Sequence, residues 1–388
     1  MPIYKLNKKK DGKQAYRVII CYTDNKGKAK NVERIIYGAQ EAKDKETELM
    51  QEYLKKKTAA DTPKTLKELY DEYIREKAHT VRETTLDKTK RNLERYVLPY
   101  LSNIKLPKFN AAILDEWKRT ISELQLQKKN PENRTSLAVT TKQNIYGELR
   151  NLFNYAVEKE YLLRNPLHNV KNFKDPYEIN PQEKIQYYTP EEFKQYISIA
   201  RQTAEASGSL TDWGYYVFFS IAFYTGMRKG EINALKWSDD EENHLHVRRS
   251  IAQKLKGGDR ETPPKNKSSY RTLQKPLPLI KILTEHKERQ KQIKGFTNDF
   301  RICGGIAPLR DTSIASKNQQ FAKLADLPKI RIHDFRHTHA TVLINEGINI
   351  QEIARRLGHS KVEITWNTYA HLYPREEERA IKILNNIE

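Results

Sequence analysis

HDFRHTHAT at residues 333–341, LGHS at 357–360 and NTYAHLY at 367–373 give the end of the chain a high density of histidines. Five of the ten histidines lie between His333 and His371. If the first motif is helical, His333 and Arg336 stand at i and i+3 and share one face. Tyr369 follows His359 by ten residues. Cations, imidazoles and a phenol are thus collected in one short segment.

A fourth motif, TGMRKGE at residues 225–231, lies upstream of these, directly after a densely apolar segment. Gly226 permits a tight backbone approach, and Arg228 offers a planar two-donor fork to a phosphate. The alternative interpretation of Arg228 is a helix-start arginine that pairs with Glu231. Phosphodiester exchange without a metal needs cations at the non-bridging oxygens, a nucleophile, and an acid for the departing oxygen. The four motifs contain candidates for these roles.

A metal site is the competing interpretation of the histidines. His333 and His337 have the i, i+4 spacing of metalloprotease zinc ligands. However, HDFRH lacks the glutamate of HExxH, and Arg336 would put a positive charge beside the ion. The two cysteines, Cys21 and Cys303, lie far apart and form no CxxC pair. We therefore expect no metal, no cofactor and no disulfide framework.

The composition indicates a polyanionic partner. With 388 residues the chain is too long for one ordinary core, which predicts two or three domains. Its 70 Lys and Arg outnumber its 50 Asp and Glu, for a formal net charge of +20, as in nucleic-acid-binding, ribosomal and membrane-surface proteins. The sequence shows no signal-peptide pattern and no apolar run of about 18 residues, so we expect no membrane anchoring. Its two distant cysteines are most consistent with a protein of the reducing cytoplasm.

Secondary-structure signals surround the motifs. Thr189 opens a capping box with proline at the first helical position, which predicts a helix start. Residues 213–223 predict a buried helix. Residues 245–254 and 269–277 predict hairpin strands around a turn-rich segment, and helices resume after Thr312.

The middle of the chain has the periodicity of four helices. The first starts near Leu66, the second at Thr84 or Thr85, and the third after the N-cap Asn110. The fourth spans residues 139–160 and is stopped by the Asn165-Pro166 step. Each helix is predicted to bury one apolar face. The faces of the first and second helices consist of Leu66, Leu69, Tyr70, Tyr73 and Ile74, and of Leu86, Leu93, Tyr96 and Val97, respectively. Those of the third and fourth consist of Ile113, Trp117, Ile121 and Leu124, and of Ile145, Leu149, Leu152, Phe153, Ala156 and Val157, respectively.

The N-terminal region is strongly basic. Residues 3–6, 16–22 and 32–37 predict three strands, and a charged helix follows at 40–57. The first 30 residues carry nine Lys or Arg against two Asp. The simple interpretation is a solvated face, and the one we favour is a sheet that tracks phosphates. Its expected DNA contacts are Lys5, Lys8, Lys9, Lys10, Lys13, Arg17, Lys26, Lys28 and Lys30.

The chain therefore predicts a multidomain, mainly α protein with small β elements. A three-stranded sheet plus helix occupies residues 1–57, and a four-helix domain occupies 64–170. An α+β domain with a C-terminal tail helix occupies 186–388. Linkers near 58–63 and 174–186 separate them.

In order, spacing and local wording, the four motifs with a hairpin lysine between them resemble the tyrosine recombinase (phage integrase) family. The match extends from Thr189 to about Pro374. The two preceding regions are similar in layout to the arm-binding and core-binding domains of integrases from phages and conjugative transposons. The resemblance implies a site-specific DNA recombinase, the integrase of a mobile genetic element. Such an enzyme cleaves and rejoins DNA through a 3′-phosphotyrosyl intermediate, without metal or ATP.

The resemblance assigns roles residue by residue. Tyr369 matches the nucleophile, and Arg228 and Arg336 match the pair that clamps the scissile phosphate. His333 and His359 match two further transition-state contacts, and of these His333 is expected to accept the proton of Tyr369.

Three more assignments follow from the resemblance. Glu231 matches the acidic neighbour that orients the first arginine. The lysine that protonates the leaving oxygen is assigned to Lys265, with Lys267 as the alternative and as a DNA contact. His339 departs from the family, which more often has an aromatic or apolar residue there, and we expect it to pack rather than react.

The implied partner is double-stranded DNA, at core and arm attachment sites. The implied assembly is a homotetramer, with an excision factor and a host DNA-bending protein as further partners. An amphipathic tail helix over residues 374–387 is expected to dock on a neighbouring protomer, and its simple interpretation is packing on its own domain. Two alternatives remain, a type IB topoisomerase that relaxes DNA and a non-catalytic DNA-binding regulator on the same fold.

Overall fold

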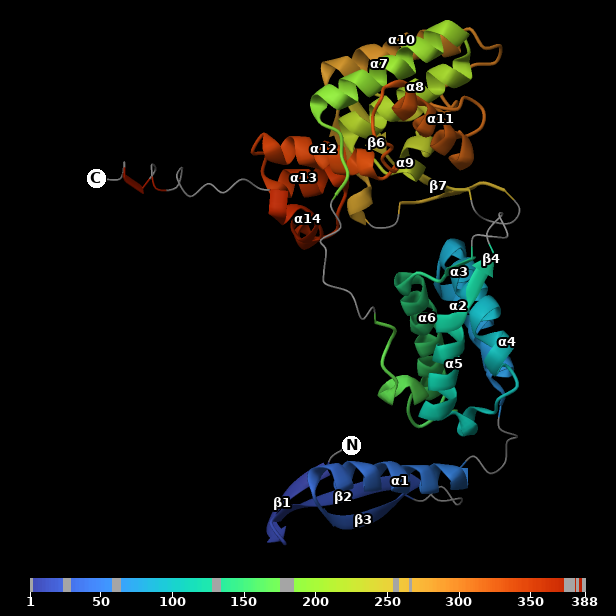
Figure 1. Cartoon of the computed structure of the whole chain (residues 1–388), viewed down its shortest axis with the longest axis vertical. Helices are drawn as coiled ribbons and strands as arrows, with labels where there is room; N and C mark the ends of the chain where they lie inside the picture. Colours follow the sequence, from blue (N-terminus) through green and yellow to red (C-terminus); the bar gives the residue numbers. More distant parts are fainter. Residues whose placement is uncertain are drawn as a thin grey trace. The chain divides into compact units, whose positions relative to one another are not determined.

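The computed structural model describes residues 3–23, 29–57, 64–127, 134–174, 185–253, 258–264, 267–372, 381, 384 and 385. It is mainly helical with small sheets, as the sequence predicts (Figure 1). Contacts within the chain divide it into two compact units, Met1–Ile179 and Asn180–Glu388, and each is described by itself. Within the described ranges, none of the helices combines the length and the apolar character that a membrane crossing requires.

The chain begins with an antiparallel sheet in the order β1-β2-β3. Its strands are β1 (Ile3–Lys10), β2 (Lys13–Thr23) and β3 (Ala29–Tyr37), and α1 (Ala39–Lys57) packs on one face (Figure 1). Val18 and Ile20 of the sheet form a core with Ala42 and Leu49 of the helix. The three predicted strands and the helix are therefore confirmed. The predicted turn at Asp11 and Gly12 is present, with positive φ at both residues.

Five helices and two short 3-10 helices follow in the first unit's described part. They are α2 (Leu66–Thr80), α3 (Glu83–Tyr96), α4 (Leu98–Leu101), η1 (Leu106–Lys108), α5 (Ala111–Glu123), α6 (Val139–Glu158) and η2 (Pro166–Asn169). The apolar faces predicted for the four main helices all join one hydrophobic cluster, fully or at its edge, apart from Val157, which is half-buried. A short hairpin of β4 (Gln125–Gln127) and β5 (Arg134–Ser136) was not predicted.

The fourth helix ends within two residues of its predicted end near Glu160, but the predicted cause, the Asn165-Pro166 step, is wrong. The α6 helix ends at Glu158, because Glu160 adopts a left-handed φ of 60° and the backbone amides of Tyr161 and Leu162 both return to the Ala156 carbonyl. Asn165 instead caps the 3-10 helix that follows it, where its side chain accepts a hydrogen bond from the Leu167 amide.

The second unit is built around α8 (Leu210–Thr225), which is buried on nearly every side. The helices that pack against it are α7 (Pro190–Ser207), α9 (Lys229–Ala234), α10 (Leu277–Lys291) and α12 (Asp334–Asn345). The other helices described in this unit are α11 (Asp311–Leu324), which packs on α7, and α13 (Ile350–Leu357) and α14 (Val362–Tyr369). The predicted capping box is present, since Thr189 accepts a hydrogen bond from the Glu192 amide and Glu192 accepts one from the Thr189 amide. α12, α13 and α14 pack in succession (Figure 1).

The predicted pair of long hairpin strands is divided into two small sheets. β6 (His244–Val247) pairs with β9 (Arg271–Gln274), and β7 (Ser250–Ala252) pairs with β8 (Arg260–Thr262). Leu277, predicted as the last strand residue, is the first residue of α10, because Pro276 and Pro278 favour a helix start there.

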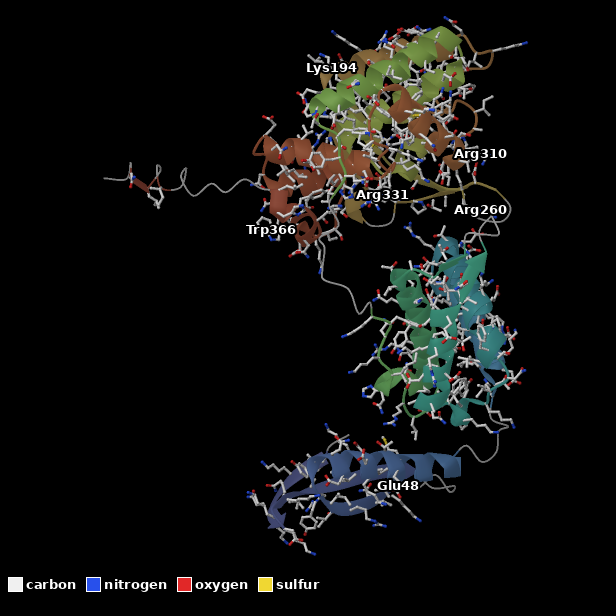
Figure 2. All side chains as sticks on the ribbon, viewed as in Figure 1. Glu48, Lys194, Arg260, Arg310, Arg331 and Trp366 are labelled. Carbon is white, nitrogen blue, oxygen red and sulfur yellow. The ribbon has the colours of Figure 1, made fainter. Side chains whose placement is uncertain are left out.

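The outer face of α14 carries exposed apolar side chains, among them Trp366, which is 52% exposed (Figure 2). The inner face of α14 buries Thr365 and Tyr369. Most of the predicted tail helix lies outside the described residues. Two of its described residues, Ile381 and Leu384, are exposed.

Candidate active site

The junction of α8 and α9 presents Arg228 at a sharp turn. Gly226 ends α8 with a left-handed φ of 63°, and a β-carbon on it would lie 2.7 Å from Cδ2 of the His339 ring. Arg228 is the N-cap of α9, and its backbone amide and Nη1 both donate to Glu231, at 3.0 and 2.9 Å. Arg228 is thus a helix-start arginine paired with Glu231, as one interpretation predicted, and its side chain remains 39% exposed.

Glu231 holds a second guanidinium that the sequence did not single out. Arg271 of β9 donates from Nη2 to Glu231 Oε2 at 2.9 Å, from Nε to the Arg356 carbonyl at 2.7 Å and from Nη1 to the Ser269 carbonyl at 3.2 Å. Burial by itself would raise the pKa of the Glu231 carboxyl, but Arg271 and Arg228 outweigh it and hold that pKa below its usual range. The carboxylate is therefore ionised, and it ties a strand to a helix start.

Arg336 of α12 points into the same cluster. Its Nη1 donates to the Gly226 carbonyl at 2.8 Å, while its Nη2 is buried without a hydrogen-bond partner among the described residues. Burial, with Arg228 and Arg271 nearby, lowers the pKa of Arg336 to about 9. Three guanidiniums against the single carboxylate of Glu231 leave a surplus of positive charge. A buried donor with no acceptor is costly, so this arrangement favours an anion at Nη2.

Two predicted histidines face this cluster. His333 is the N-cap of α12, and burial lowers its pKa to about 4, with His337, Arg336 and Arg228 adding to the effect. His359 follows the left-handed Gly358, and burial lowers its pKa to about 4, with Arg336, Arg228 and Arg271 adding to the effect. Both imidazoles are therefore neutral near pH 7, with guanidiniums close by.

Tyr369 is only 1% exposed, and it packs beside Ala340, Ile344 and Leu357. Burial raises the pKa of its phenol above the usual value. Its Oη lies 2.7 Å from Nδ1 of His337.

The residue beside the phenol is not the one that the sequence suggested. The prediction placed His333 there, whereas the His333 ring contacts the His337 ring, with 5.1 Å between their centroids. The sequence presents His337 only through the i, i+4 spacing of a zinc pattern. One signal could have pointed to its contact with Tyr369, since a residue four positions after His333 lies on the same side of the helix.

His339 is buried, as expected for a packing residue. Its Nδ1 lies 2.7 Å from the Phe223 carbonyl, and burial lowers its pKa to about 3. It also accepts a hydrogen bond from Nε of Arg356 at 3.4 Å. The imidazole thus packs against the turn at Gly226.

Comparison with known proteins identifies the family of the chain. Residues 186–376 match the phage integrase family, and residues 65–121 match the N-terminal SAM-like domain of phage integrases. The ICEBs1 integrase of Bacillus subtilis (strain 168) is 33% identical over 261 residues, which cover 65% of this chain and 67% of that protein. The chain belongs to the phage integrase family. It is therefore a site-specific DNA recombinase of the kind that mobile elements carry.

Three further similarities cover more of this integrase. The XerC-like tyrosine recombinase of Caldanaerobacter subterraneus subsp. tengcongensis is 28% identical over 414 residues, covering 99% of each chain. A Tn1549 transposon integrase in complex with a circular intermediate DNA superposes with a TM-score of 0.62 at 21% identity, over 82% of this chain and 98% of that one. A lambda integrase dimer bound to a core site superposes with a TM-score of 0.54 at 17% identity, over 93% of each chain. The two structures share the fold of this integrase.

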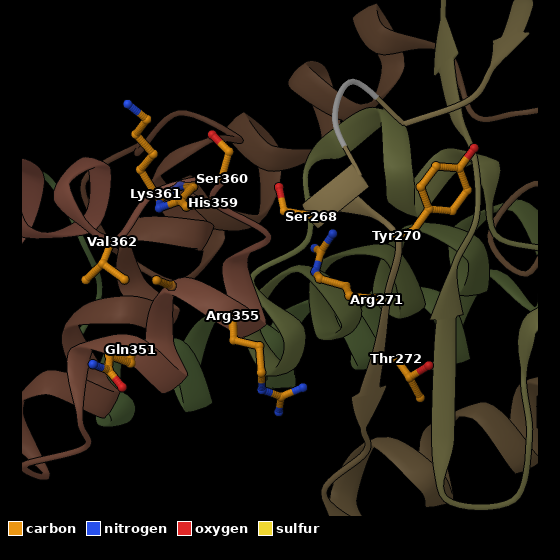
Figure 3. Close-up of a pocket in the computed structure, with 11 residues that line it drawn as sticks. Ser268, Tyr270, Arg271, Thr272, Gln351, Arg355, His359, Ser360, Lys361 and Val362 are labelled. Carbon is orange, nitrogen blue, oxygen red and sulfur yellow. The ribbon is translucent and has the colours of Figure 1, made fainter.

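A pocket of about 490 Å³ adjoins the guanidinium cluster of the integrase (Figure 3). Ser268 and Arg271 lie on one side, and His359, Ser360 and Lys361 lie on the other. Gly358 is close enough to Arg271 that a β-carbon there would lie 2.9 Å from Nη1. The pocket is therefore lined by the start of β9 and by the end of α13 with the loop after it, which the hydrogen bond from Arg271 to the Arg356 carbonyl connects.

The remaining predicted residues are less completely described. Lys265 lies outside the described residues, and Lys267 begins the 3-10 helix η4 (Lys267–Ser269), with no description of its side chain. Both assignments stay predictions. In the sheet, Lys13 pairs with Glu41 and Arg17 with Glu33. Of the other predicted DNA contacts, Lys5, Lys8, Lys9 and Lys10 of β1 and Lys30 of β3 are exposed, while Lys26 and Lys28 lie outside the described residues.

Proposed function

We propose that this integrase cleaves DNA by attack of the Tyr369 phenol on a backbone phosphorus. The attack forms a 3′-phosphotyrosyl bond and releases a 5′ hydroxyl. Arg228 and Arg336 bind the non-bridging oxygens, and His333 and His359 add hydrogen bonds to them as charge develops. Lys265, or Lys267, donates the proton to the departing oxygen. Arm and core attachment sites would be bound by the predicted domains 1–57 and 64–170.

The observation that supports this proposal most directly is the buried Nη2 of Arg336. The group lies in a cluster with a surplus of positive charge, and it has no acceptor among the described residues. A phosphate oxygen would satisfy it and would offset the mutual repulsion of the guanidiniums. Loss of one such preorganised donor costs about 3 to 4 kcal/mol in other enzymes.

The proposed chemistry needs neither a metal ion nor ATP. Exchange of a phosphodiester for a phosphotyrosine retains the energy of the bond, so religation is the reversal of cleavage with a new 5′ hydroxyl. The charge that builds on the phosphorus oxygens is met by fixed guanidiniums. These cost no reorganisation during the reaction.

The proposed assembly is a homotetramer on DNA, with an excision factor and a DNA-bending protein as accessory partners. One lambda integrase structure is a tetramer bound to a Holliday junction, which supports the tetramer. A high net positive charge of +20 supports affinity dominated by phosphate contacts, which weakens steeply as salt rises.

The deciding experiment traps the covalent intermediate. The full-length protein is incubated in EDTA with a nicked duplex that carries the direct repeat bounding its host element. The short fragment between the cleavage site and the nick carries the new 5′ hydroxyl and diffuses away. Religation is then impossible, so a protein–DNA adduct accumulates. An adduct that disappears in Tyr369→Phe supports the proposal. No adduct, or one that persists in Tyr369→Phe, refutes it, and relaxation of plasmid without that repeat would favour a topoisomerase.

A further inference from the structure

The hydroxyl of Tyr369 has one hydrogen-bond partner in the described part of the chain, and that partner is His337. Nδ1 of His337 lies 2.7 Å from Oη, within the range of a strong hydrogen bond. The two rings meet edge to face, with centroids 5.5 Å apart and planes at 62°. The contact joins α12 to α14, between residues 32 positions apart.

The burial of Tyr369 restricts where its proton can go. A phenol that is 1% exposed cannot transfer a proton directly to bulk water. An unperturbed tyrosine has a pKa of about 10, and burial moves this one further from neutrality. Attack at neutral pH therefore requires a base within hydrogen-bond distance.

The geometry points to His337 as the group that holds the Tyr369 phenol and accepts its proton during strand cleavage. This assignment rests on the proposed function, and it replaces His333 in that one role. His333 retains its place at the phosphate, because its surroundings include Arg228 and Arg336.

The proton and electron pairs balance in one step. We assign His337 the tautomer with its own proton on Nε2, in which Nδ1 accepts the hydrogen bond and then the proton of the phenol. The phenolate oxygen forms the new bond to phosphorus as the bond from phosphorus to the 5′ oxygen breaks. The general acid protonates that oxygen. In religation the 5′ hydroxyl gives its proton back to the general acid and attacks phosphorus. The bond from phosphorus to the Tyr369 oxygen breaks, and Nδ1 returns its proton to that oxygen.

The surroundings keep His337 neutral near pH 7. Burial lowers the pKa of its imidazole, with Arg331 and Arg336 acting in the same direction and Asp334 against it. A neutral ring can accept a proton, whereas a protonated ring cannot. The titratable and charged groups that face it from α12, its preceding loop and α14 are Arg331, His333, Asp334, Arg336 and Tyr369.

The test uses single-turnover cleavage of the nicked duplex by the full-length protein between pH 5 and 8. His337→Asn is the informative variant, because the Asn Oδ1 can keep a hydrogen bond near the position of Nδ1 but cannot take a proton. His337→Gln is a second variant, in case the first folds poorly, and thermal unfolding checks both. His371→Asn is the matched control, since His371 is an exposed histidine two residues beyond Tyr369.

A second substrate separates the two proton transfers. Sulfur in place of the bridging 5′ oxygen leaves without protonation, so this substrate bypasses the general acid. We expect His337→Asn to slow adduct formation about 10²-fold or more on both substrates. We also expect the fall in rate toward low pH to be lost in this variant. His371→Asn should react like the natural protein.

Three results would overturn the assignment. The first is a His337→Asn variant within about twofold of the natural rate. The second is a slow variant that keeps the natural pH profile, and the third is recovery on the sulfur substrate. Absence of any adduct with the natural protein is a different outcome, because it refutes the proposed function itself.

Discussion

Glu231 and Arg271 form an ion pair of 2.9 Å in which the side chains are 3% and 4% exposed. The same carboxylate binds Arg228, so one buried charge positions two guanidiniums. Arg271 also donates to the Arg356 carbonyl, at the end of α13 beside His359. Arg271 is therefore placed to position both Arg228 and the loop that carries His359.

The first prediction concerns this pair. Arg271→Ala leaves Glu231 buried beside Arg228 alone, and we expect a loss of about 3 to 5 kcal/mol in the free energy of unfolding. Arg271→Lys should retain stability better but lose cleavage, because a lysine cannot reproduce three directed hydrogen bonds. Urea unfolding measures the first effect and adduct formation the second. Lys291→Ala, at an exposed pair with Glu288, should change stability by less than about 1 kcal/mol.

The second prediction concerns Arg336. Arg336→Lys removes the planar fork and the hydrogen bond to the Gly226 carbonyl. We expect adduct formation to slow about 10²- to 10³-fold, while affinity for the duplex, which depends on many phosphate contacts, falls far less. Gel-shift titration beside single-turnover cleavage separates the two quantities. Equal losses in binding and cleavage would contradict a transition-state role.

The third prediction tests the turn before Arg228. Gly226 and Gly208 both end helices with left-handed φ, at 63° and 60°. A β-carbon at Gly208 meets nothing within 4 Å, whereas one at Gly226 lies 2.7 Å from His339 and 2.8 Å from Leu357. Gly208→Ala should therefore cost only the backbone strain, about 1 kcal/mol. Gly226→Ala should cost clearly more in urea unfolding and should also slow cleavage.

The fourth prediction is that the second unit loses stability as the pH falls from 7 to 5. Burial lowers the pKa of His333 and His359 to about 4 and that of His339 to about 3. Below the unfolded-state value of about 6.5, the unfolded chain therefore binds protons that the folded chain does not. For each pH unit by which the pH falls, a fully buried histidine can lower the free energy of unfolding by at most about 1.4 kcal/mol, and a half-buried one lowers it by less.

Urea unfolding at pH 7, 6 and 5 measures this effect above the range in which most carboxylates titrate. A His339→Gln variant should show a shallower pH dependence. A stability that is unchanged or greater at pH 5 would contradict the neutral state assigned to these histidines.

The fifth prediction concerns the N-terminal sheet. Removal of the exposed lysines of β1 should weaken binding to arm-site DNA, and the slope of log K against log salt should fall by about 0.9 for each phosphate that the sheet no longer neutralises. Lys45→Gln is a control, since this ammonium already faces Glu48 at 2.8 Å. An unchanged slope would remove the sheet from the DNA interface. The lysines to be replaced together by glutamine are Lys5, Lys8, Lys9 and Lys10.

Much of the fold could be predicted because local signals agreed with tertiary packing. The capping box at Thr189 and the apolar stripe from Leu66 to Ile74 depend on residues a few positions apart, and both were correct. The end of α6 was predicted to within two residues, but its cause was missed because it depends on Glu160 in a left-handed conformation, which glutamate rarely adopts. The second hairpin, β7 with β8, is too short to produce a pattern of alternation.

In the candidate site too, residues within local motifs could be predicted, and residues placed by distant contacts could not. Arg228, His333, Arg336 and His359 were found through their motifs, and the structure brings them together around one buried charge cluster. Arg271 was missed because nothing distinguishes it among 70 basic residues except its place in a strand, on the same side as the buried Leu273. Its role depends on Glu231, 40 positions away.

Arg336 and His337 are neighbours on α12, yet they reach in different directions, one to the Gly226 carbonyl and the other to Tyr369. The spacing between the proposed phosphate contact of Arg336 and the contact of His337 with Tyr369 is therefore set by the pitch of this one helix. One inserted or deleted residue here would rotate one group away from the other by about 100°. A change in the length of this helical turn should therefore separate the proposed phosphate contact from the proposed nucleophile, even where the rest of the fold adapts.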